Sequence, residues 1–86
     1  MEINFKKLTF SVEPKNYQNF WNNFLNWEKH DLDFVTEIGE QDKIFIDVGA
    51  WIGPYTLIAA SMGMKVYAFE PDKVAFHELK KNIELN

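Results

Sequence analysis

The first twelve residues alternate between apolar and polar in the manner of a β-strand, but the alternation changes phase once. The apolar positions are Ile3, Phe5, Leu8, Phe10 and Val12. They move from odd to even numbers at Lys6-Lys7, and such a slip indicates either a bulge or two short strands. Glu13-Pro14 then ends the extended run and suits the start of a helix.

Residues 16–29 carry the clearest helical repeat. Apolar side chains recur at i, i+3, i+4, i+7 and i+8, a spacing that forms one stripe along a helix. The stripe consists of Tyr17, Phe20, Trp21, Phe24 and Leu25. We interpret it as core packing; the alternative is a cap over a ligand. A shorter helix is predicted next, with Asp31 near its start, Gly39 as its stop and an inward face of Leu32, Val35 and Ile38.

The second half of the chain predicts alternating strands and helices. Residues 43–48 form a strand whose consecutive apolar residues favour burial on both faces, as in a parallel sheet. A helix is predicted over 54–62, a second strand over 65–69 and a last helix from Asp72 toward Leu85. The inner face of that last helix is expected to consist of Ala75, Phe76, Leu79 and Ile83. This order of elements is a βαβα unit.

Composition indicates one small globular domain. The 86 residues are 47% hydrophobic and 26% charged, which excludes a disordered chain. Residues 1–42 carry four lysines and eight acids, a balance of −4, whereas residues 43–86 carry five of each, a balance of zero. We therefore predict an extended and helical N-terminal segment over 1–42. Residues 43–86 are predicted to be the first βαβα unit of a domain that we expect to be truncated.

Several kinds of site and partner are disfavoured. The chain has no cysteine, which excludes disulfides and thiolate metal sites and fits a cytoplasmic location. All nine basic residues are lysine and the net charge is −4, so nucleic acid is not an expected partner. The uncharged stretch Val48–Met64 contains three glycines and a proline, and it predicts a buried loop and helix rather than a membrane span. His30 and His77 are isolated, so no metal site is expected.

The stretch Asp47-Val-Gly-Ala-Trp-Ile-Gly53 lies between a predicted strand and a predicted helix. A glycine there lets the backbone turn sharply and approach a ligand, and the helix start presents N–H groups to an anion. Glu70 ends the second strand 23 residues after Asp47, where folds of this kind bind ribose hydroxyls. The glycine loop and Glu70 together indicate a nucleoside cofactor that carries a small anionic group. Alternatively, Asp47 caps a turn and Glu70 is a solvated strand end.

The loop sequence favours S-adenosylmethionine as that cofactor. Dinucleotide sites use G-x-G-x-x-G, whose second glycine admits the pyrophosphate, but Trp51 occupies that position here. No P-loop signature follows. S-adenosylmethionine has no phosphate, so its carboxylate can lie against loop and helix N–H groups while acids such as Asp47 attract its ammonium and sulfonium.

Three blocks of the chain resemble the FkbM family of class I S-adenosylmethionine-dependent methyltransferases. They are Ile46-Asp-Val-Gly-Ala-Trp-Ile-Gly-Pro-Tyr-Thr56, Val66-Tyr-Ala-Phe-Glu-Pro-Asp72 and Leu79-Lys-Lys-Asn-Ile-Glu-Leu-Asn86. The resemblance implies an α/β, Rossmann-like fold in which Glu70 holds the ribose and Pro71 and Asp72 lie beside the adenine. The implied cofactor loop comprises Asp47, Gly49, Ala50, Trp51 and Gly53. Trp51 stands where the family more often has Asn, and Trp27-Glu28 resembles an entry segment whose acid can reach the cofactor.

The implied activity is methylation of a hydroxyl on a sugar or secondary metabolite, a small-molecule or glycan acceptor. We expect the acceptor pocket and any general base to come from strands beyond these two, so no catalytic residue is identified and the 86-residue chain is expected to be inactive alone. Two alternatives remain: a fragment of an NAD-type oxidoreductase, or a non-catalytic module that packs on a partner through its aromatic stripe. Self-association through exposed apolar edges is also expected.

Overall fold

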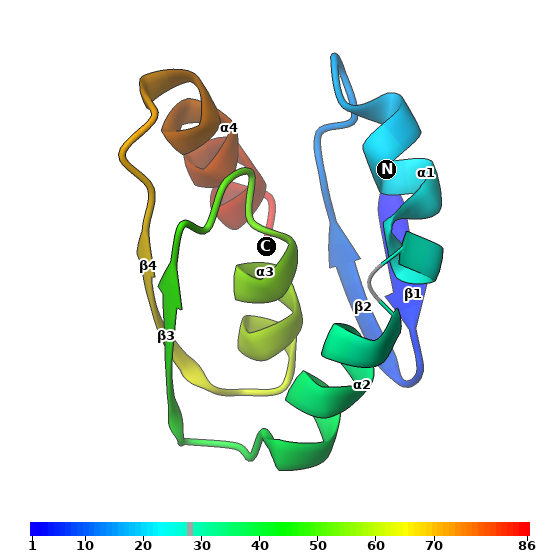
Figure 1. Ribbon diagram of the computed structural model, residues 1–86, viewed down its shortest axis with the longest axis vertical. Helices are drawn as coiled ribbons and strands as arrows, with labels where there is room; N and C mark the ends of the chain where they lie inside the picture. Colours follow the sequence, from blue (N-terminus) through cyan, green and yellow to red (C-terminus); the bar gives the residue numbers. More distant parts are fainter. Residues whose placement is uncertain (28) are drawn as a thin grey trace.

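The computed structural model in Figure 1 describes residues 1–27 and 29–86. The strands are β1 (Glu2–Phe5), β2 (Leu8–Ser11), β3 (Ile44–Val48) and β4 (Lys65–Phe69), and the helices are α1 (Gln18–Trp27), α2 (Lys29–Ile38), α3 (Pro54–Ser61) and α4 (Lys73–Glu84). Figure 1 shows β1, β2 and α1 on one side, β3 and β4 on the other, and α3 between them.

The extended N-terminus is a β-hairpin. Strand β1 pairs antiparallel with β2, and Ile3 lies opposite Phe10. The phase slip at Lys6-Lys7 is the turn, where Lys6 takes a left-handed φ of 54°. Ile3 and Phe10 are both buried. Of the two possibilities that the pattern left open, two short strands is therefore correct, and each strand turns its buried residue toward the same core.

Helix α1 begins two residues later than the pattern predicts. Asn16 has a φ of 72°, outside the helical region, and the N–H of Tyr17 donates to the carbonyl of Pro14 at 2.8 Å. These residues therefore form a turn ahead of the helix. Trp21 and Phe24 are almost fully buried in the core, which confirms core packing for this part of the aromatic stripe.

Helix α3 is the centre of the core. It carries no charged side chain and contacts β2 and α2 as well as β3 and β4. Leu57, Ile58 and Ala59 are buried, as expected for a helix covered on several sides. No described helix is long and apolar enough to cross a membrane. The uncharged stretch Val48–Met64 is instead the end of β3, a loop and α3, as predicted.

Strand β3 is covered on one face only, although its apolar run favours burial on both. Strands β3 and β4 pair in parallel as a two-stranded sheet, and α3 covers one face. On the other face Ile44 and Ile46 are each 63% exposed and Val48 is 80% exposed. A continuous apolar run thus identified a strand with two apolar faces, but only a second layer of elements could bury both.

Two of the predicted helix faces are also wrong in part. In α2, Leu32 and Val35 are buried but Ile38 is exposed. In α4, Ala75 and Leu79 are buried as predicted, whereas Phe76 and Ile83 are exposed and the polar residues Glu78 and Asn82 are buried instead. In α4, the side chains of Leu79 and Asn82 contact the loop before α3. The helix therefore buries the face that carries these two residues, and not the face with the most apolar side chains.

The bare face of the β3–β4 sheet is expected to drive self-association of the isolated chain. The exposed apolar residues on it are Ile44, Ile46, Val48, Tyr67 and Phe69, and exposed apolar patches of this kind associate. Light scattering should detect oligomers at micromolar concentration. Ile46→Lys should shift the chain toward monomer, whereas Phe34→Lys on α2, which removes another exposed ring away from the sheet, should not. Equal effects of the two variants would show that this face is not the contact.

Candidate functional site

The loop between β3 and α3 is fastened to the end of β4. The N–H groups of Gly49 and Ala50 both donate to the carbonyl oxygen of Phe69, at 2.8 and 3.0 Å. Gly49, Trp51 and Gly53 all have positive φ, at 74°, 53° and 104°. Three left-handed residues within five positions make the chain turn tightly, so the loop leaves the strand end and enters α3 at once.

The two loop glycines have different roles. Gly53 is buried with a φ of 104°, which side-chain-bearing residues rarely adopt, and a Cβ there would lie 2.8 Å from Cδ1 of Leu79 on α4, whose side chain would have to shift. Gly49 is exposed, and a Cβ there would meet nothing within 4 Å. The space over Gly49 is open to a ligand, whereas Gly53 serves packing.

Glu70 bridges the loop and the start of α4. Its Oε1 accepts from the N–H of Trp51 at 2.7 Å, and its Oε2 accepts from the N–H of Asp72 at 2.9 Å. Each carboxylate oxygen can accept a further hydrogen bond. The predicted strand-end acid is therefore held in one orientation by two backbone groups and still has acceptor capacity for a pair of hydroxyls.

Asp47 lies at the same end of the sheet, on β3. Its Oδ2 accepts from the hydroxyl of Thr56 at 2.6 Å, which ties the strand to the first turn of α3. Asp47 is half-buried. Asp47 therefore has a structural partner, which is a helix side chain rather than the following turn. Thr56 was not predicted as part of the site.

Pro71 and Asp72 follow Glu70 and start α4. Asp72 is the helix N-cap, and its Oδ2 accepts from the N–H of Ala75 at 2.9 Å, as predicted. Beside them lies an open hollow of about 380 Å³, lined by Ala68, Phe69, Glu70, Pro71 and Phe76. A hollow lined by apolar side chains, with the carboxylate of Glu70 beside them, fits a planar nucleobase that is attached to a ribose.

The N–H groups of the loop are less available than predicted. Those of Gly49, Ala50 and Trp51 donate to Phe69 and Glu70, and that of Gly53 donates to the carbonyl of Ala50 at 3.0 Å. These four N–H groups are already hydrogen-bonded within the protein, so they stabilise the loop and are not free to bind an anion. The residues present nevertheless fit an S-adenosyl group. The open surface at Gly49, the carboxylate of Glu70 and the apolar hollow lie at the same end of the sheet, where the Gly49 N–H donates to the carbonyl of Phe69.

Two groups of residues contact the loop that the sequence analysis did not assign to the site. Tyr17 and Phe20 of α1 contact the ring of Trp51, with centroids 5.8 and 4.7 Å apart. The fully buried Asn82 of α4 donates to the carbonyl of Ile52 at 2.8 Å and accepts from the N–H of Glu13 at 2.8 Å. The sequence did contain a sign of the buried asparagine, because Asn82 lies between Leu79 and Ile83 on the predicted inner face of the helix.

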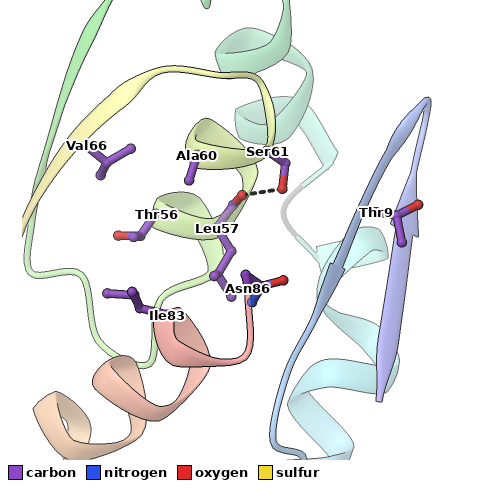
Figure 2. Close-up of a pocket in the computed structure, with 8 residues that line it drawn as sticks. All are labelled: Thr9, Thr56, Leu57, Ala60, Ser61, Val66, Ile83 and Asn86. Atoms are coloured by element: carbon purple, nitrogen blue, oxygen red, sulfur yellow. Dashed lines mark hydrogen bonds between the residues drawn. The ribbon is translucent and has the colours of Figure 1, made fainter.

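A larger pocket of about 470 Å³ lies elsewhere (Figure 2). It is lined by Thr9, Thr56, Leu57, Ala60, Ser61, Val66, Ile83 and Asn86. No charged side chain lines it, and the Ser61 hydroxyl is already donating to the carbonyl of Leu57 at 2.7 Å. None of the predicted site residues lines this pocket, so size alone does not identify the candidate site.

The histidines take no part in the described site. His30 and His77 are both exposed. Within residues 1–27 and 29–86, no three histidine or acidic side chains come together in a way that could hold a metal ion. The predicted acid of the Trp27-Glu28 segment is Glu28, which lies outside the described residues.

Comparison with known proteins finds methyltransferases. The chain is 38% identical over 55 residues to a ribosomal protein L11 methyltransferase of Helicobacter hepaticus, covering 64% of this chain and 17% of that protein. It is 39% identical over 67 residues to a tRNA (guanine(37)-N(1))-methyltransferase of Leishmania braziliensis, covering 78% of this chain and 9% of the relative. A protein of the same name from Phytophthora infestans is 36% identical, with 78% and 16% covered.

The matched region therefore spans less than a fifth of each of these relatives. No family model matches the chain, and no solved structure matches it. The relatives confirm the predicted fold class, part of a Rossmann-like methyltransferase, and agree with S-adenosylmethionine as the cofactor. They do not support the FkbM family specifically, nor the expectation that nucleic acid is no partner, since two of these three are named as tRNA methyltransferases.

Proposed function

We propose that this chain forms the cofactor-binding part of an S-adenosylmethionine-dependent methyltransferase. The observation that carries the proposal is the orientation of Glu70, whose two oxygens are fixed by the N–H groups of Trp51 and Asp72 at the end of β4. A carboxylate fixed at a strand end, beside a tight glycine loop, is how α/β folds recognise a ribose. Among the nucleoside cofactors, the similarity to methyltransferases favours S-adenosylmethionine.

Each part of the site would have its own role toward the cofactor. Glu70 would accept the two ribose hydroxyls through lone pairs that the backbone leaves free. The hollow beside Pro71 and Phe76 would receive the adenine, and the open surface at Gly49 would receive the methionine arm. When bound, the cofactor supplies an electrophilic methyl group; the protein contributes orientation, which is the main factor in such displacements.

The acceptor proposed first is a hydroxyl of a sugar or secondary metabolite, because three sequence blocks resemble the FkbM family. A second candidate is tRNA, favoured by the names of two relatives. The net charge of −4 and the absence of arginine disfavour a large RNA contact by these 86 residues themselves. Transfer of a labelled methyl group to pooled glycans and metabolites, compared with transfer to unmodified tRNA, distinguishes the two when it is measured on a polypeptide that also carries the acceptor pocket.

Calorimetry with S-adenosylmethionine, S-adenosylhomocysteine and NAD tests the proposed cofactor. We expect the chain to bind both S-adenosyl compounds and to bind NAD more weakly. The reason is that the Trp51 side chain occupies the position where a dinucleotide loop needs a glycine beside the pyrophosphate. Tighter binding of NAD would overturn the proposal in favour of an oxidoreductase fragment. Binding of none of the three would favour the non-catalytic module.

A further inference from the structure

Trp51 is a bulky residue in a backbone conformation that bulky residues avoid. Its φ is 53°, in the left-handed region, where a non-glycine side chain with a large ring is an outlier. Residues held in such conformations concentrate at ligand sites, where surrounding contacts maintain the strain. One contact that holds Trp51 in this conformation is the hydrogen bond from its backbone N–H to Oε1 of Glu70, at 2.7 Å.

The side chain of Trp51 is held separately, because its ring packs against helix α1. The rings of Tyr17 and Phe20 meet it edge to face, with interplanar angles of 85° and 84°. Phe20 in turn stacks on Phe24, which is fully buried. The Trp51 ring is therefore anchored to the core through α1, yet 39% of the residue remains exposed. A supported but partly bare indole is available to a ligand.

The covalent structure of S-adenosylmethionine places its positive charge near this ring. The sulfonium sulfur joins the methionine arm to the ribose. If Glu70 holds the ribose and the surface at Gly49 holds the arm, the sulfur lies between them. Trp51 is the one aromatic residue of the loop 49–53, and its backbone N–H donates to Oε1 of Glu70. Its ring therefore belongs to the loop residue that is hydrogen-bonded to the proposed ribose-binding carboxylate.

We propose that Trp51 is a specificity-determining residue whose indole face attracts the sulfonium and so favours S-adenosylmethionine over the neutral product S-adenosylhomocysteine. Cations are attracted to aromatic faces, most strongly to tryptophan. This inference rests on the proposed function. It assigns to α1 the task of holding the ring in place, which links the N-terminal segment to the cofactor site.

The test is the ratio of the dissociation constants for S-adenosylhomocysteine and S-adenosylmethionine, measured by calorimetry on the 86-residue chain. For Trp51→Leu we expect S-adenosylmethionine binding to weaken roughly twofold to thirtyfold while S-adenosylhomocysteine binding stays within about twofold. Trp51→Phe keeps a ring and should retain part of the preference. Phe34→Leu, at an exposed ring on α2, is the matched control and should leave both constants unchanged.

The outcomes separate this inference from the proposed function. If Trp51→Leu weakens both compounds equally, Trp51 only supports the loop and the inference is overturned while cofactor binding stands. If the unaltered chain binds neither compound, the proposed function fails and the inference fails with it. If Trp51→Leu does not fold, as judged by its unfolding transition, Trp51→Phe carries the test: an unchanged ratio in a variant with a weaker cation–π surface would also overturn the inference.

Discussion

Replacing Glu70 with alanine is expected to weaken S-adenosylmethionine binding by at least about 10- to 150-fold, the range for the loss of one hydrogen bond to a charged group. The substitution removes the charged acceptor proposed for the ribose hydroxyls, and hydrogen bonds to charged groups contribute about 1.5–3 kcal/mol each. It also releases the N–H groups of Trp51 and Asp72, so the loop loses its tie to α4. Calorimetry measures the loss. Glu37→Ala, at an exposed acid on α2, should leave the affinity unchanged.

A ligand lacking the ribose hydroxyls separates the two effects of Glu70. In the unaltered chain, the 2′,3′-dideoxy form of S-adenosylhomocysteine should bind much more weakly than S-adenosylhomocysteine itself. In Glu70→Ala the two ligands should bind alike, because the carboxylate that distinguishes them is gone. If the variant still discriminates against the dideoxy form, Glu70 supports the loop but does not contact the ribose.

Replacing Asn82 with alanine is expected to lower the free energy of unfolding by about 2–4 kcal/mol. The variant leaves the carbonyl of buried Ile52 and the N–H of Glu13 without their partners, and an unsatisfied buried polar group costs about 1–3 kcal/mol. Urea denaturation followed by circular dichroism measures the change. Because Ile52 belongs to the loop, cofactor affinity should fall as well.

Two further variants define the role of Asn82. Asn82→Asp should not restore stability, since a carboxylate oxygen can accept from Glu13 but cannot donate to the carbonyl of Ile52. Asn22→Ala, at an exposed asparagine of α1 bonded only to the Gln18 side chain among the contacts described, should cost less than about 0.5 kcal/mol. Equal losses for Asn82→Ala and Asn22→Ala would show that the buried hydrogen bonds contribute little.

The sequence by itself determined the elements and the outline of the site. Apolar and turn-residue patterns located every helix that the structure describes and the strand Lys65–Phe69 to its exact ends. Over residues 1–12 they left two short strands as one of two possibilities. The order strand, helix, strand, helix over residues 43–86 predicted a βαβα unit with parallel strands, and β3 and β4 do pair in parallel. These features follow from local geometry, in which a residue's neighbours along the chain decide its conformation.

Only the tertiary structure decided which way each surface faces and what holds the site together. A run such as Ile44-Phe45-Ile46 indicates apolar faces, but whether a face is covered depends on a layer that the run does not encode, and here one face is bare. Nor could spacing reveal that the ring of Phe20, thirty-one positions before Trp51, lies 4.7 Å from it. Contacts between residues far apart in the chain form only when hydrophobic burial brings the elements together, and here they hold the Trp51 ring of the loop between β3 and α3.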